Sequence, residues 1–225
     1  MEAGQLGSWH SEEYVAEWVG DDVIADMLSL PRKISAALVV DSGIRVEHVI
    51  DLGSGHGPYL ALFLRTFPEA RGTWVDFSEA MEERARDELE ELGDRVRFVV
   101  GDVEKLAELD LEPAQVVVSS RALHHFSPES LAGVYRAAAE LVTPGGFVFN
   151  LDHVGAPGDW EQVYRRVRDQ FTGPRKKPLK PHRHDYPLQP ADQHAAWMND
   201  GGFEHADIPW RTLYTALVGA RKPTT

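Results

Sequence analysis

Cysteine is absent from the 225-residue sequence. Its absence excludes disulfide bonds, thiolate nucleophiles and cysteine-based metal sites. The chain is long enough for one sizeable hydrophobic core, or at most two small ones. Any catalytic or metal-binding group must therefore come from other side chains.

Long apolar runs and an excess of basic residues are also missing. No stretch is long enough to cross a bilayer, and the start, MEAGQLGSWHSEEY, lacks the pattern of a secretory signal. The 23 Lys and Arg are outnumbered by 36 Asp and Glu, which gives a net charge of −13. Nucleic acid and anionic lipid repel a protein of this charge. We expect a cytoplasmic protein that acts on a small molecule, with no membrane contact and no nucleic-acid partner.

Apolar residues recur at helical spacing over residues 9–40. The first group is Trp9, Tyr14, Trp18, Val23, Ile24, Met27 and Leu30. Pro31 interrupts the pattern, and a second helical run follows through Ile34, Leu38 and Val39. We predict an N-terminal helical cap or lid over residues 1–40, ahead of a domain over residues 41–225.

Short apolar runs alternate with helical stretches from residue 46 onward. The runs are VEHVIDL, GTWVDF, RVRFVVG, AQVVVSS and GGFVFNLD. They do not alternate strictly between apolar and polar residues, which is typical of strands buried on both faces. This alternation of strands and helices along the chain predicts an α/β fold, with βαβ units and a parallel sheet covered by helices.

One of these helices can be followed in detail in SEAMEERARDELEELGD. Ser78 can cap its start, and Gly93 can close its end. Its apolar stripe consists of Met81, Ala85, Leu89 and Leu92.

A proline-rich, basic segment over residues 171–190 departs from this rhythm. Its five prolines disfavour a regular helix or central strand, and a loop of this length is typically a lid, a binding loop or a linker. After it, ADQHAAWMNDGG predicts a short helix. FEHADIPWR and TLYTALVGARK then predict a hairpin that closes the sheet.

The stretch VIDLGSGHGPYL, residues 49–60, places three glycines between a predicted strand and the next helix. Glycine allows close backbone approach and positive φ, and ligands of open α/β sheets bind outside the carboxyl ends of the strands. A dinucleotide fingerprint, G-x-G-x-x-G/A, would need glycine or alanine where the chain has Pro58. The order here is D-x-G-x-G-x-G, from Asp51 to Gly57, and Pro58 suits the first turn of a helix.

This order resembles the first motif of the class I S-adenosylmethionine-dependent methyltransferases, and four later segments are similar to that family. WVDFSEAM places Asp76 where the family's acidic residue holds the ribose hydroxyls. VVGDVEKL places Asp102 where the family recognises the adenine amino group. VVVSSRALHHF and AELVTPGGFVFNLD are similar to the family's fourth-strand and fifth-strand segments.

The five matches cover roughly residues 46–152 in order, and the resemblance implies both a fold and a cofactor. The implied fold is the Rossmann-like class I methyltransferase fold, a mostly parallel seven-stranded sheet with a C-terminal antiparallel hairpin and helices on both faces. The implied cofactor is S-adenosylmethionine. Its implied binding residues are Asp51, Gly53, Ser54, Gly55, Gly57, Asp76, Phe77, Met81, Asp102, Val103, Ser119, Ser120 and Arg32.

His124 and His125 follow the fourth strand, in the segment that faces the reacting methyl group in the resembled family. Histidine titrates near neutral pH, so it can take a proton from a hydroxyl or an amine. We expect one of the two to lie in the active site and favour His125; the alternative is that one fills the core. Asp152 and His153 lie at the same sheet edge and, with Tyr186, complete the candidate catalytic residues.

Two further features have simple interpretations. His182, His184 and Asp185 are residue types that bind metals, but their spacing matches no specific site, so we assign no metal. His56 lies between two glycines and fits the loop geometry without needing a direct role.

Together these features predict a methyltransferase that uses S-adenosylmethionine to methylate an O or N atom of a small-molecule acceptor. Three alternatives remain at this point: an RNA methyltransferase that uses the basic 171–190 loop, a nicotinamide-dependent oxidoreductase, and a cofactor-binding protein without catalysis. We expect a monomer or a homodimer. Residues 153–200, which should decide the acceptor, carry no motif that identifies it.

Overall fold

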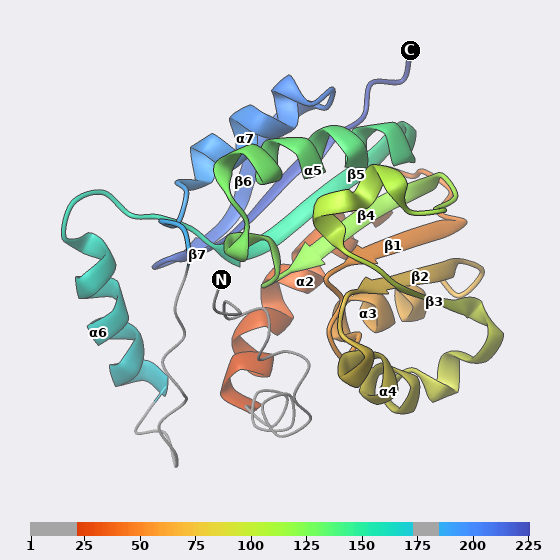
Figure 1. The fold of residues 1–225 in the computed structure, drawn as a ribbon, viewed down its shortest axis with the longest axis horizontal. Coiled ribbons are helices and arrows are strands. Elements are labelled where there is room, and N and C mark those ends of the chain that lie inside the picture. Colours follow the sequence, from red (N-terminus) through yellow and green to blue (C-terminus); the bar gives the residue numbers. More distant parts are fainter. Residues whose placement is uncertain (1–21, 173–184) are drawn as a thin grey trace.

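The computed structural model describes residues 22–172 and 185–225, and seven strands form one sheet at its centre (Figure 1). The strands are β1 (His48–Leu52), β2 (Arg71–Asp76), β3 (Val96–Val100), β4 (Ala114–Ser120), β5 (Val142–His153), β6 (Glu204–Thr212) and β7 (Thr215–Arg221). Their order is β3-β2-β1-β4-β5-β7-β6, with β1 to β5 parallel and the β6–β7 hairpin antiparallel. The fold class predicted from the sequence is confirmed.

Helices cover both faces of this sheet (Figure 1). They are α2 (Asp22–Asp41), α3 (Pro58–Thr66), α4 (Glu79–Glu88), α5 (Pro128–Leu141), α6 (Trp160–Thr172) and α7 (Ala191–Asp200), with the 3-10 helices η2 (Glu90–Arg95), η3 (Val103–Glu108) and η4 (Leu123–His125). Side chains of α2, α3 and α4 form one hydrophobic cluster with the sheet, and those of α5 and α7 form a second. Figure 1 shows α6 beyond the end of the sheet, apart from these helical layers.

The strand order fixes where a ligand site can form. Strand β1 pairs with β2 on one side and with β4 on the other, so the direction of winding reverses between β1 and β4. In open α/β sheets the crevice at such a reversal, outside the carboxyl ends of the strands, is the usual ligand site. The glycine turn after β1 lies at this point.

Helix α2 corrects one expectation. The sequence predicted a break at Pro31, but a single 20-residue helix runs through that position. A proline inside a helix costs about 3 kcal/mol, because it removes one hydrogen bond and its ring clashes with the preceding turn. Burial offsets this cost, since Leu28, Ala36 and Val39 from both sides of the proline join one core cluster.

Helix α4 follows the predicted pattern at its start and ends earlier than expected. Ser78 accepts a hydrogen bond from the Met81 N–H at 3.2 Å, as a cap should. The α-helix ends at Glu88, and η2 continues as a 3-10 helix in which Gly93 has a φ of 53°. All four residues of the predicted apolar stripe are buried.

Several expectations concern residues outside the described ranges. Trp9, Tyr14 and Trp18 of the cap lie there, as do residues 173–184 of the proline-rich loop. Residues 171 and 172, assigned to that loop from the sequence, belong to α6. The cap boundary at residue 40 and the lid roles stay predictions. No helix in the described part of the chain has the length and apolar character to span a membrane.

Candidate active site

The glycine turn between β1 and α3 depends on its glycines. Gly53, Gly55 and Gly57 have φ angles of 63°, 57° and 90°, which residues with side chains rarely adopt. At Gly53 a Cβ atom would also lie 2.3 Å from the Cβ of Ala122, just after β4. The turn therefore needs glycine for its backbone angles and, at Gly53, for its close contact with the β4 end.

Asp51 fixes this turn from beneath. Its carboxylate is buried, at 1% exposure, and accepts hydrogen bonds from the Ser54 hydroxyl at 2.7 Å and the Leu60 N–H at 3.1 Å. Burial raises the pKa of Asp51 to about 7, although the hydrogen bond from Ser54 and the positive charge of Arg32 act in the opposite direction. The Asp51 side chain therefore links the end of β1 to the start of α3.

Asp76, at the end of β2, holds the same turn from the side. One carboxylate oxygen accepts the Gly55 N–H at 2.9 Å, and the other accepts the Ser78 N–H at 3.0 Å. The indole N–H of Trp74 donates to the Gly55 carbonyl at 2.7 Å. Each Asp76 oxygen therefore accepts one backbone hydrogen bond, and a carboxylate oxygen can accept more than one.

A cavity of about 260 Å³ opens where the turn meets the carboxyl ends of β2, β3 and β4. Most of the predicted site residues line it: Arg32, Gly53, Ser54, Gly55, Asp76, Phe77, Met81, Asp102, Val103, Ser120 and His125. These residues come from segments far apart in the sequence, and the fold brings them to one place. His56 lines the cavity as well.

The other predicted site residues lie outside the cavity wall. Asp51 and Gly57 support the turn, and the Ser119 hydroxyl donates to the Leu52 carbonyl at 2.8 Å. The remaining residues of this kind are His124, Asp152, His153 and Tyr186. The Tyr186 side chain is exposed.

Sequence reasoning missed six residues that line the cavity: Pro58, Tyr59, Glu104, Arg121, Ala122 and Phe126. Arg121 and Ala122 directly follow the predicted fourth strand, so their position at its carboxyl end was a usable signal. Tyr59 was not marked by any motif. It enters the site because α3 begins at the preceding residue, Pro58.

Arg32 reaches the cavity from α2. Its Nη2 donates to the Ser120 hydroxyl at 3.2 Å, and its guanidinium lies 5.7 Å from the ring centre of Tyr59. Its Nε is buried and has no hydrogen-bond partner among the described residues. Burial lowers the pKa of Arg32, while the negative charge of Asp51 acts in the opposite direction. A buried cation with an unused donor suits a ligand anion.

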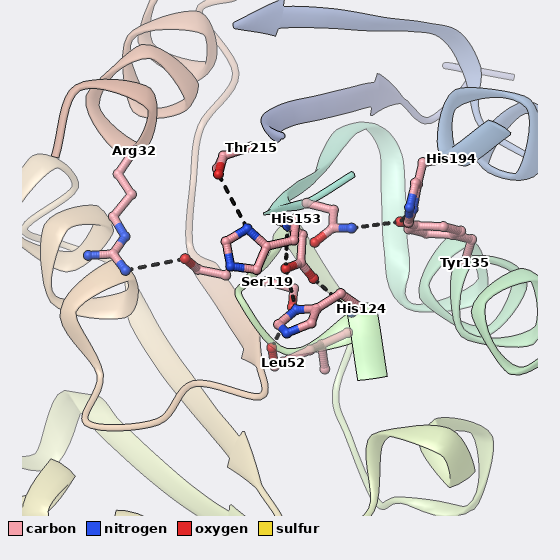
Figure 2. Close-up of polar contacts among 11 residues, drawn as sticks. Arg32, Leu52, Ser119, His124, Tyr135, His153, His194 and Thr215 are labelled. Atoms are coloured by element: carbon pink, nitrogen blue, oxygen red, sulfur yellow. Dashed lines mark hydrogen bonds and ion pairs between the residues drawn. The ribbon is translucent and has the colours of Figure 1, made fainter. Parts of the chain in front are cut away.

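Three histidine rings form a continuous group at the cavity wall; Figure 2 shows two of them, His124 and His153. His125 lines the cavity, and its ring centre lies 4.1 Å from that of His124. The His124 ring lies 5.1 Å from the ring of His153, whose Nδ1 is 3.3 Å from the Thr215 hydroxyl. The preferred candidate from the sequence, His125, is thus the one that borders the cavity.

Asp152 organises this group from β5. Its Oδ1 lies 2.6 Å from Nδ1 of His124, and both side chains are 1% exposed. The backbone N–H groups of His124 and His153 donate to the same carboxylate at 3.0 and 2.7 Å. Burial raises the pKa of Asp152, and these backbone bonds act in the opposite direction. Asp152 therefore fixes the orientation of His124, directly behind His125.

Tyr135 and His194 belong to a second buried polar group (Figure 2). The Tyr135 hydroxyl is 2.7 Å from Nδ1 of His194 and accepts from the Asn150 amide at 2.8 Å. Burial lowers the pKa of His194 to about 4, against the attraction of Asp152. This neutral network joins α5, α7 and β5 beneath the site. Within the described ranges, no three His, Asp or Glu side chains gather to hold a metal ion.

Comparisons with known proteins agree with this geometry. Residues 49–146 match a family model described as a methyltransferase domain. Aclacinomycin 10-hydroxylase RdmB of Streptomyces purpurascens is 34% identical over 161 residues, which are 70% of this chain and 42% of that protein. 3-Amino-4-hydroxybenzoate 4-O-methyltransferase of Streptomyces cremeus is 33% identical over 106 residues, 47% of this chain and 28% of that protein.

A solved structure shows the same fold over the whole length of this chain. Human N-acetylserotonin methyltransferase in complex with S-adenosylmethionine superposes with a TM-score of 0.65 at 14% identity, over 100% of this chain and 61% of that one. The chain spans less than half the length of the two relatives above. The motif order and the match to the family model agree, and residues 49–146 belong to the class I S-adenosylmethionine-dependent methyltransferase family.

Proposed function

We propose that this protein binds S-adenosylmethionine in the 260 Å³ cavity and transfers its methyl group to an O or N atom of a small molecule. One observation carries the proposal: a single cavity joins the glycine turn, Asp76, Asp102 and His125. The family's cofactor motifs and a candidate base therefore border the same space. The net charge of −13 favours a small acceptor over nucleic acid, and a cytoplasmic monomer or homodimer stays our expectation.

The residues present suit this cofactor. Asp76 offers acceptor oxygens for the ribose hydroxyls, held in place by the Gly55 and Ser78 N–H groups. Among the described residues, a Cβ at Gly55 would contact the Met81 sulfur alone, at 3.9 Å. The buried Nε of Arg32 is available for the methionine carboxylate. Phe77, Met81, Asp102 and Val103 would surround the adenine.

The catalytic work of the chain itself is positioning and proton transfer. Bound S-adenosylmethionine supplies a methyl group made electrophilic by its sulfonium. The cavity wall aligns the acceptor and excludes water, and alignment alone is worth roughly 7–11 kcal/mol in favourable cases. His125 takes the proton of the acceptor hydroxyl or amine. Asp152 holds His124 behind it, so the paired rings keep His125 in place.

Calorimetric titration tests the cofactor site. Wild-type protein should bind S-adenosylmethionine and S-adenosylhomocysteine in the micromolar range, and Asp76→Asn should weaken both by roughly tenfold or more, because an amide replaces one hydroxyl acceptor by a donor. Asp87→Asn, an exposed position on α4, serves as the matched control and should bind as wild type does. Folded wild type that binds neither compound would overturn the proposal.

The name of one relative favours a second candidate reaction. Aclacinomycin 10-hydroxylase is 34% identical over 161 residues, so hydroxylation is the second candidate reaction. Product mass separates the two reactions. With methyl-labelled S-adenosylmethionine and a panel of phenols and amines, methyl transfer adds one labelled CH2 unit, whereas hydroxylation adds one oxygen atom and no label. We expect the labelled product.

A further inference from the structure

Tyr214 lies in the short turn of the β6–β7 hairpin, together with Leu213. Leu213 has a φ of 55°, which is uncommon for a residue with a branched side chain. The Arg211 side chain donates from Nε to the Leu213 carbonyl at 3.2 Å, and the Tyr214 carbonyl accepts the Val154 N–H at 2.8 Å. These bonds fix the turn beside the end of β5, and the Tyr214 side chain is buried there.

Helix α6 contacts Tyr214 through two arginine side chains. Arg168 donates from Nη1 to the Tyr214 hydroxyl. The guanidinium groups of Arg165 and Arg168 lie 5.2 and 5.5 Å from the Tyr214 ring centre, within the range of cation–π attraction. Arg165 is fixed in turn by Glu161, one helical turn earlier, at 2.7 Å. Because α6 lies apart from the helical layers (Figure 1), these contacts join it to the sheet.

The Tyr214 ring also packs against the histidine group. Its centre lies 5.0 Å from that of His153, and Nδ1 of His153 lies 3.3 Å from the hydroxyl of Thr215, the next residue along the chain (Figure 2). The His153 ring lies 5.1 Å from His124, which lies 4.1 Å from His125. A row of four rings therefore runs from the hairpin turn to the cavity wall.

We propose that Tyr214 is a positioning residue that fixes His125 at the cavity wall. Anchored by α6, its ring holds His153, and His153 holds His124. Close-packed interiors transmit small displacements, and a misplacement of about 1 Å at a reacting group can cost roughly 100-fold in rate. Tyr214 therefore affects the rate without contacting the acceptor. The inference rests on the proposed function, since it concerns the base assigned there.

Two substitutions of Tyr214 test this role through kcat and KM. Tyr214→Leu removes the ring and should lower kcat by roughly tenfold or more, while the acceptor KM and the affinity for S-adenosylhomocysteine stay within about twofold of wild type. Tyr214→Phe keeps the ring and its contacts with both guanidinium groups, and should keep kcat within about threefold of wild type. Wild-type kcat in Tyr214→Leu, or equal losses of kcat in the two variants, would overturn the proposal.

The NMR signals of isotope-labelled histidine rings give a second test, which needs no acceptor. The Cε1–H signal of His125, identified by its loss in His125→Ala, should move in Tyr214→Leu and stay in place in Tyr214→Phe. Spectra are recorded with and without S-adenosylhomocysteine. Tyr164→Leu is the control, because it removes a ring of α6 that packs against Trp160 at 5.4 Å, and it should leave the signal in place. A His125 signal that does not move in Tyr214→Leu would overturn the proposal.

A double variant on α6 keeps the proposal testable if Tyr214→Leu does not fold. Arg165→Leu/Arg168→Leu removes both contacts with the Tyr214 ring from a helix outside the helical layers. It should lower kcat by roughly threefold or more and move the His125 signal. Arg166→Leu, exposed on the same helix, is the matched control and should behave as wild type. A double variant with wild-type kcat and an unmoved His125 signal would overturn the proposal.

Failure of the proposed function has a different signature. Wild-type protein that methylates no acceptor would contradict the proposed function, whatever the spectra show. The His125 signal in Tyr214→Leu and Tyr214→Phe would then decide alone whether Tyr214 positions that ring.

Discussion

His124 and His125 are neighbours in sequence but differ in their surroundings. The 3-10 helix η4 turns His125 toward the cavity and His124 toward Asp152. An adjacent histidine pair indicates that one ring can reach the site, but only the phase of the short helix decides which. We therefore propose that His125 contacts the acceptor and that His124 is a positioning residue.

Replacing His125 tests this division of roles. His125→Ala should lower kcat by a factor of about 10²–10⁴, the usual contribution of a general base, while affinity for S-adenosylhomocysteine is retained. The rate is measured with whichever acceptor yields the labelled product. His205→Asn, at an exposed position with a φ of 55° that Asn tolerates, is the control and should keep the wild-type rate. An unchanged rate in His125→Ala would remove the base role.

The turn between β1 and α3 is the element that gives the site its shape. Gly43 and Gly53 have similar φ angles, 69° and 63°, but among the described residues only Gly53 has a close neighbour, Ala122. Gly43→Ala should cost about 1–2 kcal/mol of unfolding free energy, for the backbone alone. Gly53→Ala should cost more and should also weaken binding of S-adenosylhomocysteine, because the turn or the β4 end must shift.

Urea unfolding and calorimetry of these two variants separate the contributions. The Gly43 variant should bind S-adenosylhomocysteine as wild type does, since Gly43 lies in the turn after α2, away from the cavity. Equal destabilisation in both variants, with binding intact, would show that the contact with Ala122 relaxes without cost.

Local signals in the sequence were sufficient to predict the elements and much of the cavity wall. The order of strands and helices, the Ser78 cap and the turn from Asp51 to Pro58 all depend on neighbouring residues. Pro31 misled the prediction because tertiary burial of both halves of α2 outweighs a local helix breaker. The pairing of His124 with Asp152 could not be predicted, since it depends on the register of β5 beside β4.

Buried titratable groups make the stability of the whole molecule depend on pH in opposing ways. Burial raises the pKa of Asp51 from 3.8 to about 7, so the folded chain keeps a proton there that the unfolded chain releases, and stability falls as pH rises through this window. Burial lowers the pKa of His56 and His194 from 6.5 to about 4. Between pH 4 and pH 6.5, His56 and His194 bind protons in the unfolded chain but not in the folded chain. Their contribution to the free energy of unfolding therefore increases with pH over this range.

Asp51→Asn isolates one of these opposing contributions. An Asn side-chain oxygen can still accept the bonds from Ser54 and Leu60, but it cannot ionise. The unfolding free energy of wild type, relative to the variant, should therefore fall by up to about 4 kcal/mol between pH 4 and pH 7. Urea unfolding at a series of pH values measures this difference, with Asp87→Asn as the exposed control that should follow wild type. A difference that stays constant with pH would mean that Asp51 ionises in the fold as it does in the unfolded chain, stabilised there by Arg32.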